Sequence, residues 1–281
     1  REEIERKQAQ TVTELLAQTP GVVVTNNGGR GKGTSVFLRG TNSDHVLVLI
    51  DGVKQGSATL GSVAFEHLTT EQIDRIEIVR GPRSSLYGSE AIGGVIQIFT
   101  RKGAEGFKPR FSVGTGSYDA REVVLGASGG TGDGWYNLSV SDYTTNGFDA
   151  NDDSEIDDDG YDNRSYALRG GYQFSNQVEA ELFWTRNEGD AEYDGFQNET
   201  ASRLETLGGV VRLNPTSSWE VEIRLGRSLD ESSNYKDGVW NSSYDTERDT
   251  ASFQSSHHLN ASSNLTWGVD YQDDQISVDD I

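Results

Sequence analysis

The sequence contains no cysteine and no methionine, and it has only 4 prolines among its 281 residues. The absence of cysteine excludes disulfide bonds and thiolate metal sites. No apolar run approaches the length of about 18 residues that a transmembrane helix needs. Basic residues are scarce, since 24 Lys+Arg stand against 45 Asp+Glu and give a net charge of −21, which disfavours nucleic-acid binding. The lack of Met at position 1 suggests a mature or trimmed piece of a longer product.

The acidic residues are concentrated in one part of the chain. Residues 1–104 contain 12 Lys+Arg and 11 Asp+Glu, whereas residues 105–281 contain 12 Lys+Arg and 34 Asp+Glu. Such an asymmetry predicts two regions with different surroundings. We therefore expect a first domain over residues 1–104 and a second over residues 105–281.

Short elements separated by glycine predict an α+β fold for residues 1–104. Residues 11–18 are expected to form a helix that ends before Pro20-Gly21, and residues 69–72 resemble the start of another helix. Residues 26–33 (NNGGRGKG) form a glycine-rich excursion between expected strands. Short apolar or β-branched runs predict the strands, at residues 22–25, 35–39, 46–50, 76–79 and 95–100.

The glycine-rich segment and the histidines do not fit a catalytic motif. A phosphate-binding loop needs Lys followed by Ser or Thr at the start of a helix, but Gly33 follows Lys32 and a strand comes next. No Gly-x-Ser-x-Gly motif is present. His257 and His258 are adjacent in a strand pattern, where neighbouring side chains point to opposite faces. We predict that the protein is not an enzyme and has no catalytic residues.

Several motifs of the first region occur together in one known family. These are residues 37–42 (FLRGTN), 45–53 (HVLVLIDGV), 76–94 (IEIVRGPRSSLYGSEAIGG) and 95–98. In this order they resemble the plug domain of TonB-dependent outer-membrane receptors, and their residues are most similar to those of the cobalamin receptors of that family. The resemblance implies a plug inside a transmembrane β-barrel, and a TonB-binding segment expected before Arg1.

Charged residues of the first region have two possible interpretations. They could simply be paired structural charges of an α/β domain. The resemblance implies instead that plug charges face the barrel wall and rearrange when TonB pulls. Both interpretations apply to the same residues, which are Arg39, Asp51, Glu77, Arg80 and Arg83.

Residues 105–281 show strict alternation of apolar and polar side chains, which predicts strands with one apolar face. Strands of about 10–13 residues suit a tilted crossing of a bilayer, and aromatic residues recur near their ends. Short turns at Ser175-Asn176, 215–217 and Ala261-Ser262 fit the periplasmic side, and long acidic loops at 146–162, 189–201 and 231–246 fit the extracellular side. About nine antiparallel strands are expected, near residues 109–116, 120–129, 134–145, 163–174, 177–188, 202–213, 218–230, 247–260 and 263–276.

Nine strands are too few to enclose a plug of about 100 residues, because plugged lumens occur in barrels of about 22 strands. The second region is therefore expected to be the N-terminal part of an incomplete barrel, with about 260 further residues elsewhere. A soluble β-rich binding or adhesion protein would also show alternation, although its strands are usually shorter.

Residues 146–162 contain eight Asp or Glu among 17 residues, and such a run repels itself unless cations neutralise it. Calcium prefers oxygen ligands of this kind, but the spacing excludes an EF-hand because Tyr166 would stand at the position that needs Glu. In the family, acidic residues of two extracellular loops bind calcium. The resemblance implies a calcium site with ligands at matching positions, namely Asp149, Asp157, Asp159, Asp194 and Glu199.

The resemblance also implies that the substrate binds to the outward loops of the plug, here residues 26–34 and 54–63. Cobalamin is rich in amides, which backbone groups and small polar side chains on glycine-rich loops can approach closely. The expected substrate-binding residues are Asn27, Gly28, Arg30, Lys32, Gly33, Thr34, Lys54, Gln55, Ser57 and Ser62.

The function implied by the resemblance is TonB-dependent uptake of cobalamin or a related corrinoid across the bacterial outer membrane. The alternative within the same fold is a siderophore or haem receptor. The expected partners are TonB, the corrinoid and outer-membrane lipid, and the outer loops are potential attachment points for phages or bacteriocins. Nucleic acid is not expected as a partner.

Overall fold

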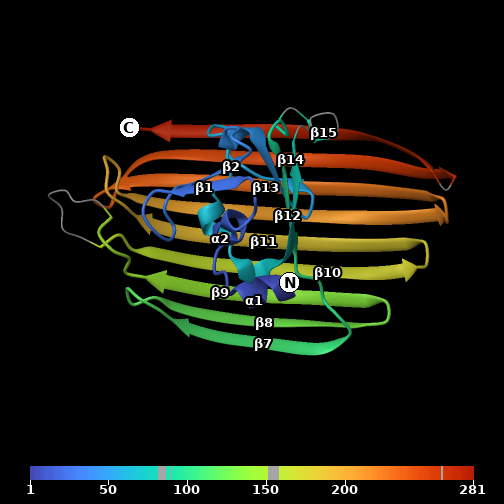
Figure 1. Cartoon of the computed structure of the whole chain (residues 1–281), viewed down its shortest axis with the longest axis horizontal. Coiled ribbons are helices and arrows are strands. Elements are labelled where there is room, and N and C mark those ends of the chain that lie inside the picture. Colours follow the sequence, from blue (N-terminus) through green and yellow to red (C-terminus); the bar gives the residue numbers. More distant parts are fainter. Residues whose placement is uncertain (82–86, 89, 151–157, 261) are drawn as a thin grey trace.

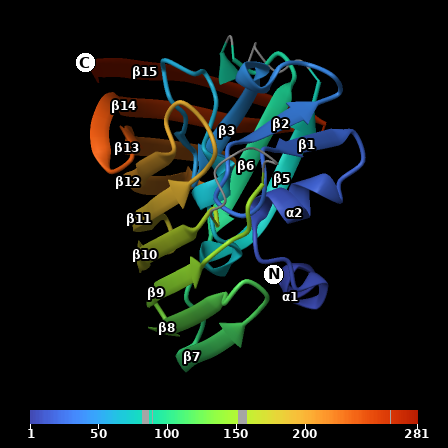
Figure 2. The ribbon, with the colours of Figure 1, turned by 90° about the vertical axis from the view of Figure 1, so that its left-hand side faces the viewer.

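The computed structural model describes residues 1–81, 87–88, 90–150, 158–260 and 262–281. These residues form a small α+β unit over residues 1–104, here called the N-terminal unit, and a large antiparallel sheet that follows it (Figure 1). The sheet curves, and the N-terminal unit packs against its concave face (Figure 2). The strands of the large sheet follow one another in sequence order, because each strand pairs with its neighbours along the chain.

The N-terminal unit contains two small sheets in its described residues. Strands β1 and β2 pair antiparallel, and a four-stranded sheet has the order β4-β3-β6-β5, in which β3 and β6 are parallel. The helices, the strands and three 3-10 turns are α1 (Glu2–Lys7), α2 (Val12–Ala17), β1 (Val22–Asn26), β2 (Thr34–Leu38), η1 (Ser43–His45), β3 (Val46–Ile50), β4 (Val53–Lys54), η2 (Phe65–His67), η3 (Thr70–Gln72), β5 (Ile73–Arg80) and β6 (Gly94–Thr100).

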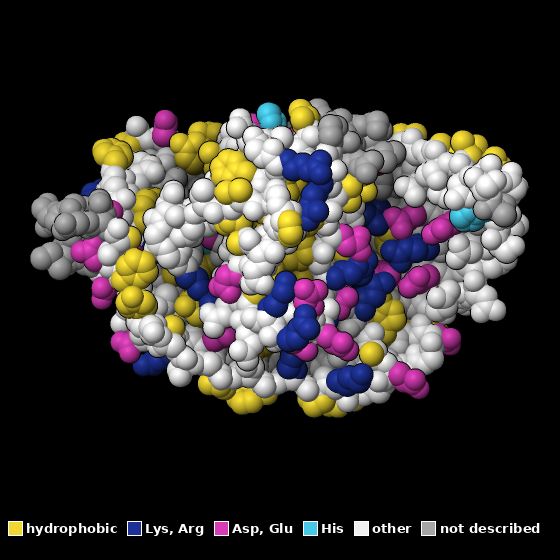
Figure 3. Space-filling view, in the orientation of Figure 1, with side chains coloured by type: hydrophobic (Ala, Val, Ile, Leu, Met, Phe, Trp, Pro, Cys, Tyr) yellow, Lys and Arg dark blue, Asp and Glu magenta, His cyan; other side chains and the backbone are white. Residues whose placement is uncertain are grey.

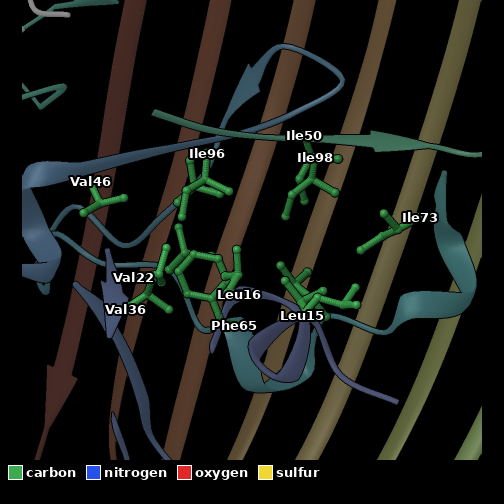
Figure 4. Packing of buried hydrophobic residues seen from close by; sticks show 14 of the residues in the cluster. Leu15, Leu16, Val22, Val36, Val46, Ile50, Phe65, Ile73, Ile96 and Ile98 are labelled. Carbon is green, nitrogen blue, oxygen red and sulfur yellow. The ribbon is translucent and has the colours of Figure 1, made fainter. Parts of the chain in front are cut away.

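The apolar residues of these elements meet in one core. In α2, the Thr11 hydroxyl accepts a hydrogen bond from the Glu14 backbone N–H at 3.2 Å and caps the helix. The apolar face of that helix packs against β1, β3 and β6, whose side chains fill the space above it (Figure 4). Every residue of β3 is buried, as its continuous apolar run predicts. Leu204 from the large sheet joins the same core.

The prediction that a helix begins at residues 69–72 is wrong. The segment forms only the 3-10 turn η3, and β5 begins directly at Ile73. Its polar side chains bond to distant parts of the chain: the Thr70 hydroxyl donates to the Ala9 carbonyl at 2.9 Å, and the Gln72 amide donates to Asn187 at 3.1 Å. These tertiary contacts fix the segment more strongly than its local helix signal.

The large sheet has nine strands among the described residues, as expected. Their order from β7 to β15 confirms an antiparallel meander after the α+β unit, with β7 and β15 at its two edges. The bounds are β7 (Gly106–Thr115), β8 (Arg121–Thr131), β9 (Gly134–Thr145), β10 (Tyr161–Ser175), β11 (Val178–Glu192), β12 (Glu199–Thr216), β13 (Trp219–Lys236), β14 (Val239–Asn260) and β15 (Ser263–Asp280).

The two faces of this sheet differ as the alternation predicts. Apolar side chains lie on the outer face, where Leu225 is 61 % exposed. Polar side chains such as Asn187 and Thr206 lie on the concave face, where each is only 1 % exposed against the N-terminal unit. Figure 3 shows charged side chains of both signs gathered over the concave side, toward the end with short turns. No helix in the described ranges is long and apolar enough to cross a membrane.

The prediction of a long loop at residues 231–246 is wrong. Strands β13 and β14 continue through this segment and are joined by a tight turn at Asp237 and Gly238, both of which have positive φ. The Asp-Gly pair is a strong hairpin signal, but residues 231–234 (ESSN) are polar on both faces and hide the strand pattern. The loop expected at 189–201 is likewise shorter, because β11 ends at Glu192 and β12 begins at Glu199.

Candidate functional site

A cavity of about 670 Å³ lies between the N-terminal unit and the large sheet. One wall is formed by the glycine-rich segment after β1 and by residues 57–64 after β4. The other wall comes from the ends of β11, β12 and β13 on the side of the long connections. Residues far apart in the sequence thus enclose a polar space whose size suits a small-molecule ligand.

Close packing of the glycine-rich segment explains the need for glycine in it. The side-chain oxygen of Asn26 accepts hydrogen bonds from the backbone N–H groups of Gly28 and Gly29, at 3.0 and 2.7 Å. Gly31 has φ +80°, and a Cβ atom there would collide with the ring of Tyr161 on β10. The segment can therefore lie flat against the sheet only with glycine at this position.

Lys32 is the buried cation of this segment. Its side chain leaves the residue 3 % exposed, and its Nζ donates to the backbone carbonyls of Asp159 and Gly160, at 3.0 and 2.9 Å. Burial lowers the pKa of Lys32, while the carboxylates of Asp159, Glu192 and Asp194 oppose that shift.

Glu66 and His67 form the floor of the cavity beside β10. The His67 ring lies 3.0 Å from the Tyr161 hydroxyl, which also donates to the Glu66 carbonyl at 3.3 Å, and the Asn163 amide donates to the His67 carbonyl at 3.3 Å. Burial raises the pKa of Glu66 to about 8 and lowers the pKa of His67 to about 4. Both side chains are therefore mostly neutral near pH 7.

Six of the ten expected substrate-binding residues line this cavity: Asn27, Lys32, Gly33, Thr34, Ser57 and Ser62. They come from two separate segments, which the fold brings together at one cavity. Their role in binding a substrate stays a prediction.

The other four expected residues make contacts outside the cavity lining. Arg30 donates to the Gln10 side chain at 2.8 Å, and Lys54 donates to Glu90 at 2.6 Å. The Gln55 side chain accepts a hydrogen bond from the Thr206 hydroxyl of the sheet at 3.0 Å. Gly28 packs beside Ala150 in the connection between β9 and β10, here called the acidic connection. The side chains of the other three residues attach the loops to their surroundings in this conformation.

The expected calcium ligands are spread over two hollows. Asp159 and Asp194 line the cavity, whereas Glu199 lines a second hollow of about 580 Å³ and Asp149 is exposed. Asp157 lies outside the described residues.

The acidic side chains partly fit calcium. Their donors are the hard oxygens that calcium prefers. However, no group of three or more His, Cys, Asp or Glu among the described residues is arranged to hold a metal ion. The backbone carbonyls of Asp159 and Gly160 already accept hydrogen bonds from Lys32, and the Ala150 N–H donates to the Asp159 carboxylate at 3.1 Å. The described residues alone therefore do not form a complete calcium site, and calcium stays a prediction.

Part of the cavity was missed by reasoning from the sequence. Its sheet-side lining includes small polar groups of β12 and β13 and the Asp230 carboxyl, and Thr200, Ser232 and Asn234 lie in strand segments that were expected to be loops. The inward alternation of polar residues would have identified the residues on these two strands. The missed residues are Glu66, His67, Tyr193, Thr200, Ser202, Asp230, Ser232 and Asn234.

A buried ionic cluster lies between the N-terminal unit and the sheet, away from the cavity. Arg169 on β10 contacts Asp51 and Glu181 at 2.6 Å each, and all three side chains are almost fully buried. Glu181 also contacts Lys102 and Arg212, both at 2.6 Å. Asp51 therefore faces the large sheet, which is the position that the resemblance implies for charges of the first region.

The other charged residues of the first region that were singled out from the sequence form no ion pair with the large sheet within the part of the chain that the structure describes. Glu77 pairs with Arg75 on the same strand at 2.7 Å, which is a structural pair. Arg39 adopts a positive φ of 52° at the end of β2, and Arg80 is exposed at the end of β5. Arg83 lies outside the described residues.

Comparisons with known proteins agree with the plug resemblance. The family model "TonB-dependent Receptor Plug Domain" matches residues 1–95. The Vitamin B12 transporter BtuB of Photobacterium profundum is 33 % identical over 282 residues, covering 99 % of this chain and 46 % of that protein. The Vitamin B12 transporter BtuB of Vibrio cholerae serotype O1 is 44 % identical over 149 residues, covering 53 % of this chain and 24 % of that protein.

Solved structures share the fold. A mutant of the ferric enterobactin receptor PfeA of Pseudomonas aeruginosa in complex with enterobactin has a TM-score of 0.81 at 16 % identity, covering 98 % of this chain and 49 % of that chain. The siderophore receptor PirA of Acinetobacter baumannii has a TM-score of 0.78 at 18 % identity, covering 98 % of this chain and 47 % of that chain. The chain spans about half the length of the relatives that it matches.

Proposed function

The chain belongs to the TonB-dependent receptors, which are outer-membrane proteins, and from this membership we propose that it takes up cobalamin or a related corrinoid with energy supplied through TonB. The N-terminal unit is the plug, and the nine-stranded sheet is part of the surrounding barrel. Sequence similarity to two Vitamin B12 transporters supports the corrinoid assignment. The ligand passes unchanged in this proposal, so no catalytic group is required.

The cavity is the observation that carries the proposal. It lies where the outward loops of the plug meet the barrel strands, and Ser, Thr and Asn side chains supply both donors and acceptors along its wall. Such groups match the carboxamides of a corrinoid, which also donate and accept hydrogen bonds. The ligand would contact plug loops and barrel strands at the same time, so its binding could shift the conformational equilibrium of the plug.

The charge of the cavity favours a neutral or cationic ligand over an anionic iron chelate. Its described lining includes one lysine, the carboxylates of Asp159 and Asp194, and the carboxyl groups of Glu66 and Asp230, of which Glu66 is mostly neutral near pH 7. The ammonium of that lysine is already bonded to two backbone carbonyls. An anionic siderophore complex would meet repulsion from Asp159 and Asp194 in a partly desolvated space.

Direct binding measurements test this proposal. The intact receptor in detergent is titrated with cyanocobalamin, in the presence of calcium and then of a chelator, and with an anionic ferric siderophore as the competing ligand. Saturable binding of cyanocobalamin that the siderophore does not displace is the expected result. Binding of the siderophore alone would transfer the substrate to that class.

A cavity-filling variant locates the binding site. Ser202 lines the cavity from β12, and Ser202→Trp should reduce the affinity for cyanocobalamin at least tenfold by occupying its volume. Val211→Trp on the same strand serves as the matched control, because Val211 is 36 % exposed and does not line this cavity. Equal affinities for the two variants would place the ligand elsewhere.

Calcium binding and TonB coupling remain parts of the same proposal. Weaker cyanocobalamin binding after chelation would support a metal site at the acidic connections, and indifference to chelation would argue against it. Uptake of labelled cyanocobalamin that requires functional TonB would support energy coupling.

A further inference from the structure

The contact between Lys32 and the start of β10 joins two parts of the receptor that are far apart in the sequence. The ammonium is buried, and its two hydrogen bonds reach the carbonyls of Asp159 and Gly160, at 3.0 and 2.9 Å. These carbonyls belong to the end of the acidic connection between β9 and β10, and not to the plug. A positive charge from the plug is therefore inserted into the most acidic part of the barrel.

The surroundings of this ammonium resemble those of a bound cation. Besides the two carbonyl oxygens, the carboxylates of Asp159, Glu192 and Asp194 are the charges that interact with it. The Glu192 carboxylate also accepts a hydrogen bond from the Gly160 N–H at 3.1 Å, which connects β11 to the same point. One ammonium thus stands among oxygen atoms from the ends of two barrel strands, in a place where like charges would otherwise repel.

The plug holds Lys32 firmly in this position. Its backbone carbonyl accepts hydrogen bonds from the Asn26 side chain at 3.2 Å and from the Thr34 hydroxyl at 2.8 Å. Gly31, directly before it, lies against the Tyr161 ring at the beginning of β10. The backbone of Lys32 is therefore tied to the two-stranded sheet of β1 and β2, and its side chain starts from a fixed position beside β10.

Two other cations of the outward plug loops have different partners. Arg30 lies over the Tyr143 ring, with its Cζ 3.6 Å from the ring centroid, and bonds to Gln10. Lys54 bonds to Glu90 and Gln272. Of these three side chains, Lys32 is the one that bonds to the acidic connection.

We propose that Lys32 is a tethered cation, which neutralises the acidic cluster of Asp159, Glu192 and Asp194 and fastens the start of β10 to the outward loop of the plug. It is a positioning residue for the cavity, because both the loop and Asp159 line that space. The proposal deepens the receptor function and rests on it for the role of the cavity, but the contact itself requires no ligand. A mobile cation should therefore replace Lys32 when its charge is removed.

Hydrogen exchange of the ligand-free, intact receptor tests this proposal. Lys32→Met removes the charge and keeps much of the side-chain volume, and Lys54→Met at the end of β4 is the matched control. In chelator, backbone amides of residues 158–162 and 190–194 should exchange about tenfold faster or more in the Lys32 variant, because two charge-assisted hydrogen bonds are lost. Millimolar calcium should restore much of this protection, and the Lys54 variant should match the parent receptor in both conditions.

The alternatives give distinct results. Unchanged exchange in Lys32→Met would overturn the proposal, and so would faster exchange that calcium does not reduce, because that result would indicate lost packing alone. The same change in Lys54→Met would point to a general charge effect and also contradict it. Lys32→Arg, which keeps the charge, should retain most of the protection in chelator even if the methionine variant fails to fold. Because no ligand is added, failure of cyanocobalamin binding would not affect these outcomes.

Discussion

Substitution of Arg169 by methionine should loosen the plug from the barrel wall. Arg169 donates from Nη1 to Asp51 and to the Thr100 carbonyl, at 2.6 and 2.9 Å, and from Nη2 to Glu181 at 2.6 Å. The substitution leaves Glu181 with two other cations, Lys102 and Arg212. Asp51 keeps only its hydrogen bonds with Thr100 among those described, so the cost should fall mainly on this buried carboxylate.

The magnitude follows from the burial of the pair. The side chains of Asp51 and Arg169 are 1 % and 6 % exposed, so solvent screens their interaction little. Removing one partner of a buried ion pair typically costs about 3–5 kcal/mol. The double variant Arg169→Met with Asp51→Asn should recover most of this loss, because an asparagine at position 51 needs no counter-charge and still accepts a hydrogen bond from the Thr100 N–H.

A buried thiol can report on opening of the plug. The 281 residues contain no cysteine, and Ala91 is 0 % exposed in the smaller of the two plug clusters, so Ala91→Cys supplies a reporter. In the parent receptor carrying this reporter, the labelling rate tracks the free energy of opening. Arg169→Met should raise the rate by about a hundredfold to a few thousandfold, as a change of about 3–5 kcal/mol predicts. A change below tenfold, or a double variant no better than the single one, would refute the reasoning.

Four further predictions concern the plug and the outer face of the barrel. Because burial lowers the pKa of His67 from 6.5 to about 4, the plug should lose about 3 kcal/mol of stability as the pH falls from 6.5 to 4, and His67→Gln should abolish that loss in the labelling assay. Burial raises the pKa of Glu66 from 4.5 to about 8, so the stability that its protonated form gives the plug is fully present below pH 4.5 and is lost as the pH rises through 8. Glu66→Gln should flatten this loss of stability with rising pH in the same labelling assay. Gly31→Val should collide with the Tyr161 ring and speed amide exchange in residues 26–34, whereas unchanged exchange would contradict the close packing. Leu225→Arg on the outer face should destabilise the barrel by about 2–4 kcal/mol in lipid-based urea titrations if the residue lies near the bilayer centre, and an unchanged midpoint would argue against lipid contact.

Much of the fold could be predicted because its signals are local and periodic. The run of five apolar residues in β3 is buried throughout, and alternation located all nine strands of the large sheet. The errors occurred where this periodicity stops. Beyond Asp230, β13 is polar on both faces and resembles a loop, although Asp237-Gly238 marked the hairpin.

The candidate site was less predictable because it depends on contacts between distant segments. The sequence indicated two polar plug loops, and six of their residues do line one cavity. It did not indicate that Gln55 bonds to Thr206 in the barrel wall, or that Asp230 approaches from β13. Such pairings depend on the register between plug and barrel, which no local pattern records.

Lys32 shows how the same residue type acquires a different role from its surroundings. In the sequence it is one of several polar residues in a glycine-rich loop, and ligand binding is a reasonable expectation for an exposed lysine there. The structure buries its ammonium against Asp159 and Gly160, so a ligand would have to compete with two existing hydrogen bonds to reach it. Competition of that kind would release the start of β10 from the plug. An uncharged, amide-rich ligand can instead bind to the neighbouring Asn and Ser side chains and leave this contact intact, which is a further physical reason to favour a corrinoid over an anionic chelate.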